Sequence, residues 1–182
     1  MNKGWWRRNI WGLLLIVPLI AGTFAFGIDE AYKYNYTMLP KEPVPIDGTG
    51  RAVLDDYAAR LIEVKRVETE AQLKRVEVFG QNRLPSNVSV WRGMVSIEAP
   101  EDSLVNVCDS WLVDGQGRRY RNAPSELGGD SRSFAACGPD DEKQPAPYTV
   151  TFYFLLPSGV RPTALLITWD PQLPRFIEFP IP

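Results

Sequence analysis

An apolar run near the N-terminus, Ile10–Phe26, constrains this chain more than any other feature. A helix of about 17–25 apolar residues is long enough to cross the hydrocarbon core of a bilayer. Three basic residues precede the run, whereas acidic residues follow it. Because Lys and Arg gather at the cytoplasmic end of such helices, the sequence predicts a short cytoplasmic segment over 1–9, a transmembrane helix over 10–27 and an extracytoplasmic remainder.

A cleaved secretory signal is the main alternative for this segment. A signal also begins with basic residues and an apolar stretch, and Thr23-Phe24-Ala25 offers a poor cleavage site. The bulky Phe24 and the length of the run favour a retained anchor. A helix buried in a soluble core is a third interpretation, which the basic flank and the three nearby tryptophans disfavour.

The composition of the rest of the chain indicates one packed domain. Residues 28–51 are predicted to form a tyrosine- and proline-rich linker, and a domain over 52–182 has an ordinary size. The near balance of 20 Lys and Arg against 22 Asp and Glu does not favour nucleic acid as a partner. The chain has no histidine, which removes Ser-His-Asp and Cys-His catalysis and the commonest zinc ligand. We therefore expect neither an enzyme nor a metal or cofactor site.

Short apolar segments separated by turn residues predict an all-β domain. In Tyr148–Leu156, large apolar residues occupy every second position, as in a half-buried strand. Val88–Ala99 carries apolar residues on both faces, as an interior strand does. Further strands are expected over Ala59–Val67 after a short helical or irregular lead-in, over Leu73–Phe79, Leu104–Val113 and Thr163–Trp169, from Arg118 onward, and over Phe176–Phe179 as an edge strand. About seven or eight short strands are typical of an antiparallel β-sandwich.

Cys108 and Cys137 are the two cysteines of the chain. Under the predicted topology both lie in an oxidising compartment, where an isolated pair is most often a disulfide. A catalytic or metal-binding thiol pair is the alternative, but the spacing is not that of a CxxC motif. The disulfide would pin the long polar loop over 122–147 to the sheet.

A small basic cluster is the candidate binding site. Arg118, Arg119 and Arg121 could contact an anionic envelope polymer or lipid, although solvent-facing strand residues would give the same pattern.

Two other motifs carry weaker signals. Asp140-Asp141-Glu142 lacks the ligand spacing of a calcium loop, so a solvated acidic loop is the favoured interpretation. Asn35 and Asn87 begin N-glycosylation sequons, which matter only in a eukaryotic source.

Two motifs in the C-terminal part resemble a known family. Leu112–Tyr120 follows the pattern L-V-D-x-x-G-x-x-Y, and Phe154 and Pro157 give a later F-x-x-P. This part of the chain resembles the extracytoplasmic immunoglobulin-like domains of unknown function found in many small bacterial membrane-anchored proteins and lipoproteins. The resemblance implies an immunoglobulin-like β-sandwich on a membrane anchor, sometimes with a binding role, and it supplies no functional residues. The paired cysteines depart from many members of that family.

These observations together predict a single-pass protein of the cell envelope. The predicted cytoplasmic segment is too short to fold, so we expect a binding or accessory role with another envelope or membrane protein as partner. The alternative is a β-sandwich that binds a small ligand, an ion or an envelope polymer directly and is secreted after cleavage of the signal.

Overall fold

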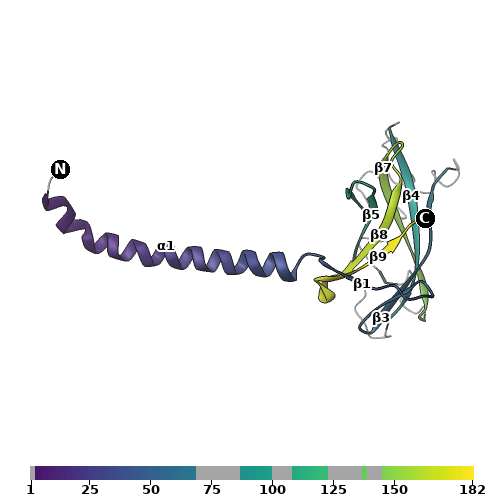
Figure 1. Cartoon of the computed structure of the whole chain (residues 1–182), viewed down its shortest axis with the longest axis horizontal. Coiled ribbons are helices and arrows are strands. Elements are labelled where there is room, and N and C mark those ends of the chain that lie inside the picture. Colours follow the sequence, from purple (N-terminus) through teal and green to yellow (C-terminus); the bar gives the residue numbers. More distant parts are fainter. Residues whose placement is uncertain (1–2, 69–86, 100–107, 123–136, 139–144) are drawn as a thin grey trace. The chain divides into compact units, whose positions relative to one another are not determined.

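The computed structural model of the chain describes residues 3–68, 87–99, 108–122, 137–138 and 145–182. The chain divides into two compact units, Met1–Leu39 and Pro40–Pro182. The first unit is a single long helix, and the described residues of the second form nine strands in two sheets (Figure 1). The prediction of a mostly β chain with one apolar N-terminal helix is confirmed.

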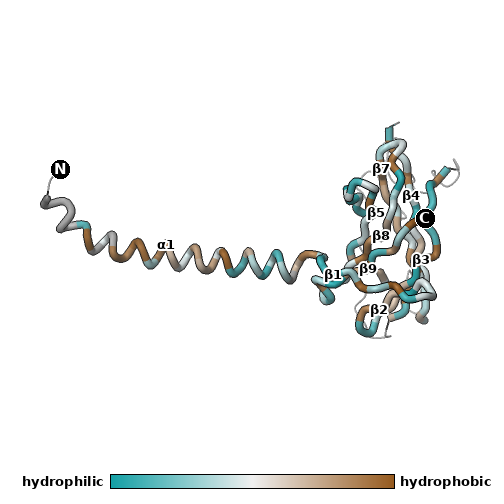
Figure 2. The backbone as a smooth tube through the Cα atoms, viewed as in Figure 1, coloured by the Kyte–Doolittle hydropathy of each residue, from teal (hydrophilic) through white to brown (hydrophobic). Residues whose placement is uncertain are grey.

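The helix α1 (Lys3–Thr37) is apolar over most of its length (Figure 2). Leu14–Tyr36 has the length and composition of a membrane span, and none of it is buried. Thr23 donates its hydroxyl to the carbonyl oxygens of Leu19 and Ile20, at 2.8 and 3.0 Å. Because the hydroxyl is satisfied within the helix, Thr23 is compatible with an apolar environment. Such a helix could span a membrane or serve as a signal sequence.

The helix replaces the first part of the linker expected over 28–51. Two pairs of side chains one turn apart support this extension beyond the apolar run. Lys33 forms an ion pair with Asp29 at 2.6 Å, and the rings of Tyr32 and Tyr36 stack with their centroids 4.3 Å apart. Two tyrosines of the expected tyrosine-rich linker therefore lie on one face of a helix.

The second unit contains a five-stranded and a four-stranded sheet. In the five-stranded sheet the neighbours are, in order, β1 (Glu42–Val44), β9 (Arg175–Pro180), β8 (Pro162–Trp169), β5 (Cys108–Asp114) and β6 (Arg119–Arg121). In the four-stranded sheet they are β2 (Arg51–Leu54), β3 (Tyr57–Arg66), β4 (Val88–Glu98) and β7 (Tyr148–Pro157). A short 3-10 helix, Asp170–Gln172, joins β8 to β9.

One hydrophobic core lies between the two sheets, because each sheet buries alternate residues of its strands. The predicted inward face of β7 is confirmed, and β4 is an interior strand, as expected. The four-stranded sheet contributes Val95, Ile97, Val150, Phe152, Phe154 and Leu156, and the five-stranded sheet contributes Leu112, Leu165, Ile167, Trp169, Ile177 and Phe179. These side chains are almost wholly removed from water, which supplies most of the driving force for folding.

Two expectations about the strands need correction. The segment before Tyr57 is the strand β2 rather than a helical or irregular lead-in, because it pairs with β3 in a tight hairpin. β9 is not an edge strand, because β1 pairs with its far side, and this pair is parallel rather than antiparallel. The strand expected over Leu73–Phe79, and residues 104–107 of another, lie outside the described residues.

Two isolated β-bridges connect the five-stranded sheet to the four-stranded sheet. Ile46, just after β1, pairs with Ala52 of β2. Asn122, just after β6, pairs with Phe154 of β7, and its Oδ1 accepts a hydrogen bond from the backbone N–H of Tyr153 at 3.0 Å. Since bare edge strands can pair with other chains, these bridges protect the edges of both sheets.

Candidate functional site

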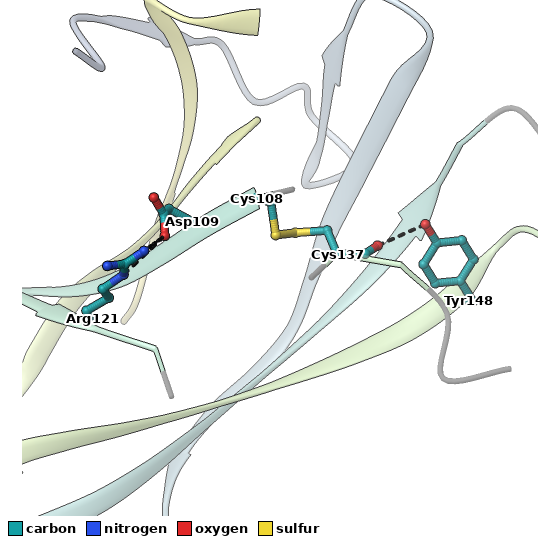
Figure 3. Close-up of a disulfide and its surroundings, with 5 residues drawn as sticks. All are labelled: Cys108, Asp109, Arg121, Cys137 and Tyr148. Carbon is teal, nitrogen blue, oxygen red and sulfur yellow. Dashed lines mark hydrogen bonds and ion pairs between the residues drawn. A yellow bond between two sulfur atoms is a disulfide. The ribbon is translucent and has the colours of Figure 1, made fainter. Parts of the chain in front are cut away.

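The predicted disulfide joins Cys108, at the start of β5, to Cys137, with Cα atoms 5.7 Å apart (Figure 3). Both cysteines are buried. The hydroxyl of Tyr148, at the start of β7, donates a hydrogen bond to the Cys137 carbonyl at 2.9 Å. Cys137 is thus held covalently to one sheet and by a hydrogen bond to the other. Because buried disulfides lack access to an attacking thiolate, this bridge has a structural role.

Aromatic rings pack near this end of the core. Tyr57 lies against Trp169 with ring centroids 5.9 Å apart and nearly parallel planes. Burial raises the pKa of Tyr148 to about 12, with a smaller contribution from Tyr57. Tyr148 therefore stays protonated over the whole physiological range and acts as a hydrogen-bond donor.

The three arginines suggested as a binding cluster lie on the hairpin formed by β5 and β6. The Nε of Arg118 donates to Asp114 Oδ2 at 2.7 Å, and Arg121 forms an ion pair with Asp109 (Figure 3). Arg119 is exposed and lies on the same face of β6 as Arg121. Two of the three guanidinium groups are therefore paired with carboxylates of their own hairpin, which reduces the field available to an external anion.

Asp114 organises the turn of this hairpin. Its Oδ1 accepts hydrogen bonds from the backbone N–H groups of Gln116 and Arg118, at 2.9 and 3.0 Å, and its Oδ2 accepts from the Tyr120 hydroxyl at 3.1 Å. Burial alone would raise the pKa of Asp114, but the hydrogen bonds, chiefly those from Arg118, outweigh burial and lower it to about 2. Gly117 has a φ of 78°, which glycine adopts without strain. The D-x-x-G-x-x-Y pattern is therefore a turn motif.

A groove on the four-stranded sheet is a candidate binding site that sequence reasoning missed. It opens to solvent and has a volume of about 420 Å³, a size found among small-ligand sites. Its lining comes from the β2–β3 hairpin, from the end of β4 and from the segment just before β7. The lining residues are Arg51, Val53, Asp55, Asp56, Tyr57, Ala58, Glu98, Ala99, Ala146 and Pro147. We call it the hairpin groove.

The apolar part of the hairpin groove is made of short side chains. Val53 is 47% exposed although it is a large apolar residue on a strand, so part of its surface is open to a ligand. Ala58 is buried, while Ala99 is half-buried and Pro147 is exposed. Short apolar groups next to an exposed valine leave room for an alkyl chain to make contact.

The charged part of the hairpin groove is mostly fixed by ion pairs. Arg51 Nη2 lies 2.7 Å from Glu98 Oε2. Asp55 accepts two hydrogen bonds from Arg175, at 2.9 and 2.6 Å, and the resulting ion pair lowers the pKa of Asp55. Asp56, the next residue of the turn, is exposed and forms no ion pair with any described residue.

The hairpin groove could not be identified from the sequence, because its lining comes from three distant segments. Only the register of the sheet unites them, with Ala58 opposite Glu98 on one side of β4 and Ile97 opposite Tyr148 on the other. The pair Asp55-Asp56 was the one local signal, and it stood in a segment expected to be irregular.

The remaining candidate residues add no site. Asp140-Asp141-Glu142 lies outside the described residues, so its role as a solvated loop stays a prediction. Within the part of the chain that the structure describes, no group of three or more His, Cys, Asp or Glu side chains could hold a metal ion.

The chain was compared with known proteins at the level of families, of sequences and of folds. No family model matches it, and neither a curated protein nor a solved structure shows significant similarity to it. The site must therefore be interpreted from its own chemistry.

Proposed function

We propose that this chain is a single-pass membrane protein of the cell envelope with a cytoplasmic N-terminus. In this proposal the β unit lies outside the cytoplasm and serves as a binding or accessory subunit for another envelope or membrane protein. The observation that carries the proposal is the bare apolar surface of α1. The 23 residues over Leu14–Tyr36 rise about 35 Å, slightly more than the roughly 30 Å of a bilayer core. An apolar surface of this size needs lipid or protein around it.

An immunoglobulin-like sandwich is the fold class that we propose for the β unit. The strand order supports it. In one sheet β8 lies between β9 and β5, as strand F lies between G and C in an immunoglobulin domain, and in the other sheet β4 pairs with β7, as strand B pairs with E. The chain also changes sheets between β4 and β5, between β6 and β7, and between β7 and β8. The disulfide departs from the common B–F position, because it starts from β5.

Cleavage of the N-terminal segment is the alternative, and the helix itself does not decide between the two. Carbonate extraction of native membranes followed by intact-mass determination separates them. We expect a full-length protein that resists extraction and gains two mass units on reduction of the Cys108–Cys137 bond. A soluble species that begins after α1 would overturn the anchor and leave a secreted ligand-binding domain.

The sequon at Asn87 provides a test of orientation in a eukaryotic microsome system. Asn87 is exposed in the turn before β4, and its carbonyl accepts a hydrogen bond from the N–H of Ser158 at 2.7 Å. In an Asn35→Gln background we expect one glycan on Asn87, removed by endoglycosidase and absent in the matched Asn87→Gln variant. Glycosylation of an acceptor site engineered before α1, with none on Asn87, would reverse the proposed orientation.

A further inference from the structure

The charges of the described residues that line the hairpin groove do not balance. Among the described residues, its lining holds three carboxylates and one guanidinium. Arg51 is paired with Glu98, and Arg175, from outside the lining, is paired with Asp55. One negative charge, on the exposed Asp56, is left without a counter-charge among the described residues. The groove therefore favours a ligand that carries a positive charge.

The paired charges also hold the groove in shape. The two hydrogen bonds from Arg175 fix the carboxylate of Asp55, and Asp55 itself has a φ of 53° in the two-residue turn. Tyr57, which follows the turn, is held by its stacking on Trp169. Because the wall is fixed before a ligand arrives, little freedom is lost on binding.

The apolar surface beside Asp56 favours a cation on an alkyl stem over a bare metal ion. Val53 offers its exposed side chain, and Ala99 and Pro147 extend the apolar surface across the groove. Lys and Arg side chains combine an aliphatic stem, which packs on apolar surface, with a charged head that stays at a polar rim. The groove also opens to solvent, so a side chain that projects from a polypeptide segment can reach it.

We propose that the hairpin groove binds a lysine or arginine side chain presented by an extended segment of the partner protein. The cationic head lies at Asp56, and the stem lies on Val53 and its apolar neighbours. This inference rests on the proposed function, because it names the chemistry of the partner which that function requires.

A peptide titration tests the inference on the full-length chain in detergent, with methyl-labelled alanine and valine. The probe is the blocked peptide acetyl-Gly-Gly-Lys-Gly-Gly-amide, and the same peptide with an acetylated lysine side chain is its neutral match. We expect the lysine peptide to shift the methyl signals of Val53 and Ala58, and to leave Ala164 of the other sheet unshifted. The neutral peptide should bind about fivefold more weakly at low salt, and added salt should remove the difference.

Two variants connect the binding to the groove. Asp56→Asn should lower the affinity of the chain for the lysine peptide about fivefold. Asp170→Asn, which removes an exposed aspartate from the 3-10 helix, should leave its affinity unchanged. Equal binding of the charged and neutral peptides, or equal effects of the two variants, would overturn the inference. The titration does not depend on membrane orientation, so its failure and a failure of the extraction or glycosylation experiments are separate results.

Discussion

The strand β5 and the hairpin of β2 and β3 use aspartate in opposite ways. At the end of β5, the Asp114 carboxylate is buried and accepts four hydrogen bonds from its own hairpin. In the turn between β2 and β3, Asp56 is exposed and has no ion pair with a described residue. A polar group whose hydrogen bonds are all satisfied internally stabilises the fold, whereas an unpaired one remains available for a ligand. The contrast separates the part of the β unit that maintains structure from the part that we propose for recognition.

The largest effect is expected at the other end of β5, where the disulfide begins. Replacing both cysteines, Cys108→Ser and Cys137→Ser, should lower the free energy of unfolding by about 3–4 kcal/mol, because the bond closes a loop with a sequence separation of 29. Urea denaturation of the full-length chain in detergent measures this loss. A loss below about 1 kcal/mol would show that β5 is held mainly by packing.

The next largest effect is expected at Asp114. Asp114→Ala leaves the donors of Gln116, Arg118 and Tyr120 without their acceptor, so we expect the melting temperature to fall by roughly 5–10 °C. Circular dichroism against temperature measures the change. An unchanged melting temperature would show that Asp114 does not stabilise the fold and would contradict its contrast with Asp56.

The acid limit of stability should also depend on Asp114. Its pKa is about 2 in the folded chain, against an ordinary value of 3.8, so the unfolded chain takes up a proton first as the pH falls. The stabilisation is therefore complete above about pH 4 and is lost as the pH falls toward 2. Urea denaturation between pH 5 and 2 should give a weaker pH dependence for Asp114→Asn than for the natural chain.

A smaller effect is expected at Tyr148. Tyr148→Phe removes the hydrogen bond to Cys137 and should cost about 1 kcal/mol at neutral pH. Because burial raises the pKa of Tyr148 to about 12, its folded form resists ionisation, and the natural chain should lose stability as the pH rises from 10 to 12. Denaturation at pH 8 and pH 11 tests both statements. An alkaline loss of equal size in Tyr148→Phe would assign it to other tyrosines.

The smallest effect is expected at Asp56. Asp56→Asn should leave the melting temperature within about 1–2 °C of the natural chain, because an exposed residue that forms no ion pair with a described residue contributes little to folding. The same thermal scan as for Asp114→Ala measures it. A large loss would mean that the carboxylate has a structural partner, and the contrast between the two turns would disappear.

The sequence predicted those parts of the fold that depend on local patterns. The alternation in Tyr148–Leu156 predicted the buried face of β7, because a strand has a side-chain period of two. The strand expected from Arg118 onward is confirmed as β6, which pairs with β5. The predicted topology, which places Cys108 and Cys137 in an oxidising compartment, was enough to predict the disulfide between them.

Features that depend on distant contacts were missed. No local pattern shows that residues 42–44 pair with β9, so β9 was taken for an edge strand. The end of α1 was missed because pairs such as Asp29 and Lys33 continue the helix after the apolar pattern has ended. The hairpin groove was missed for the same reason as β1, since the sheet register brings its lining together.

The parallel pairing of β1 with β9 determines how the β unit responds to mechanical load. Tension applied through α1 enters at residues 41 and 42, whose backbone N–H groups bond to the Pro174 carbonyl at 2.8 and 3.1 Å. When the opposing force acts at the C-terminus, the two parallel strands are pulled in shear, so their hydrogen bonds share the load instead of breaking one at a time. The bridge from Ile46 to Ala52 passes part of that load to the second sheet. If α1 anchors the chain as proposed, the β unit is therefore attached at a point where it resists being pulled apart.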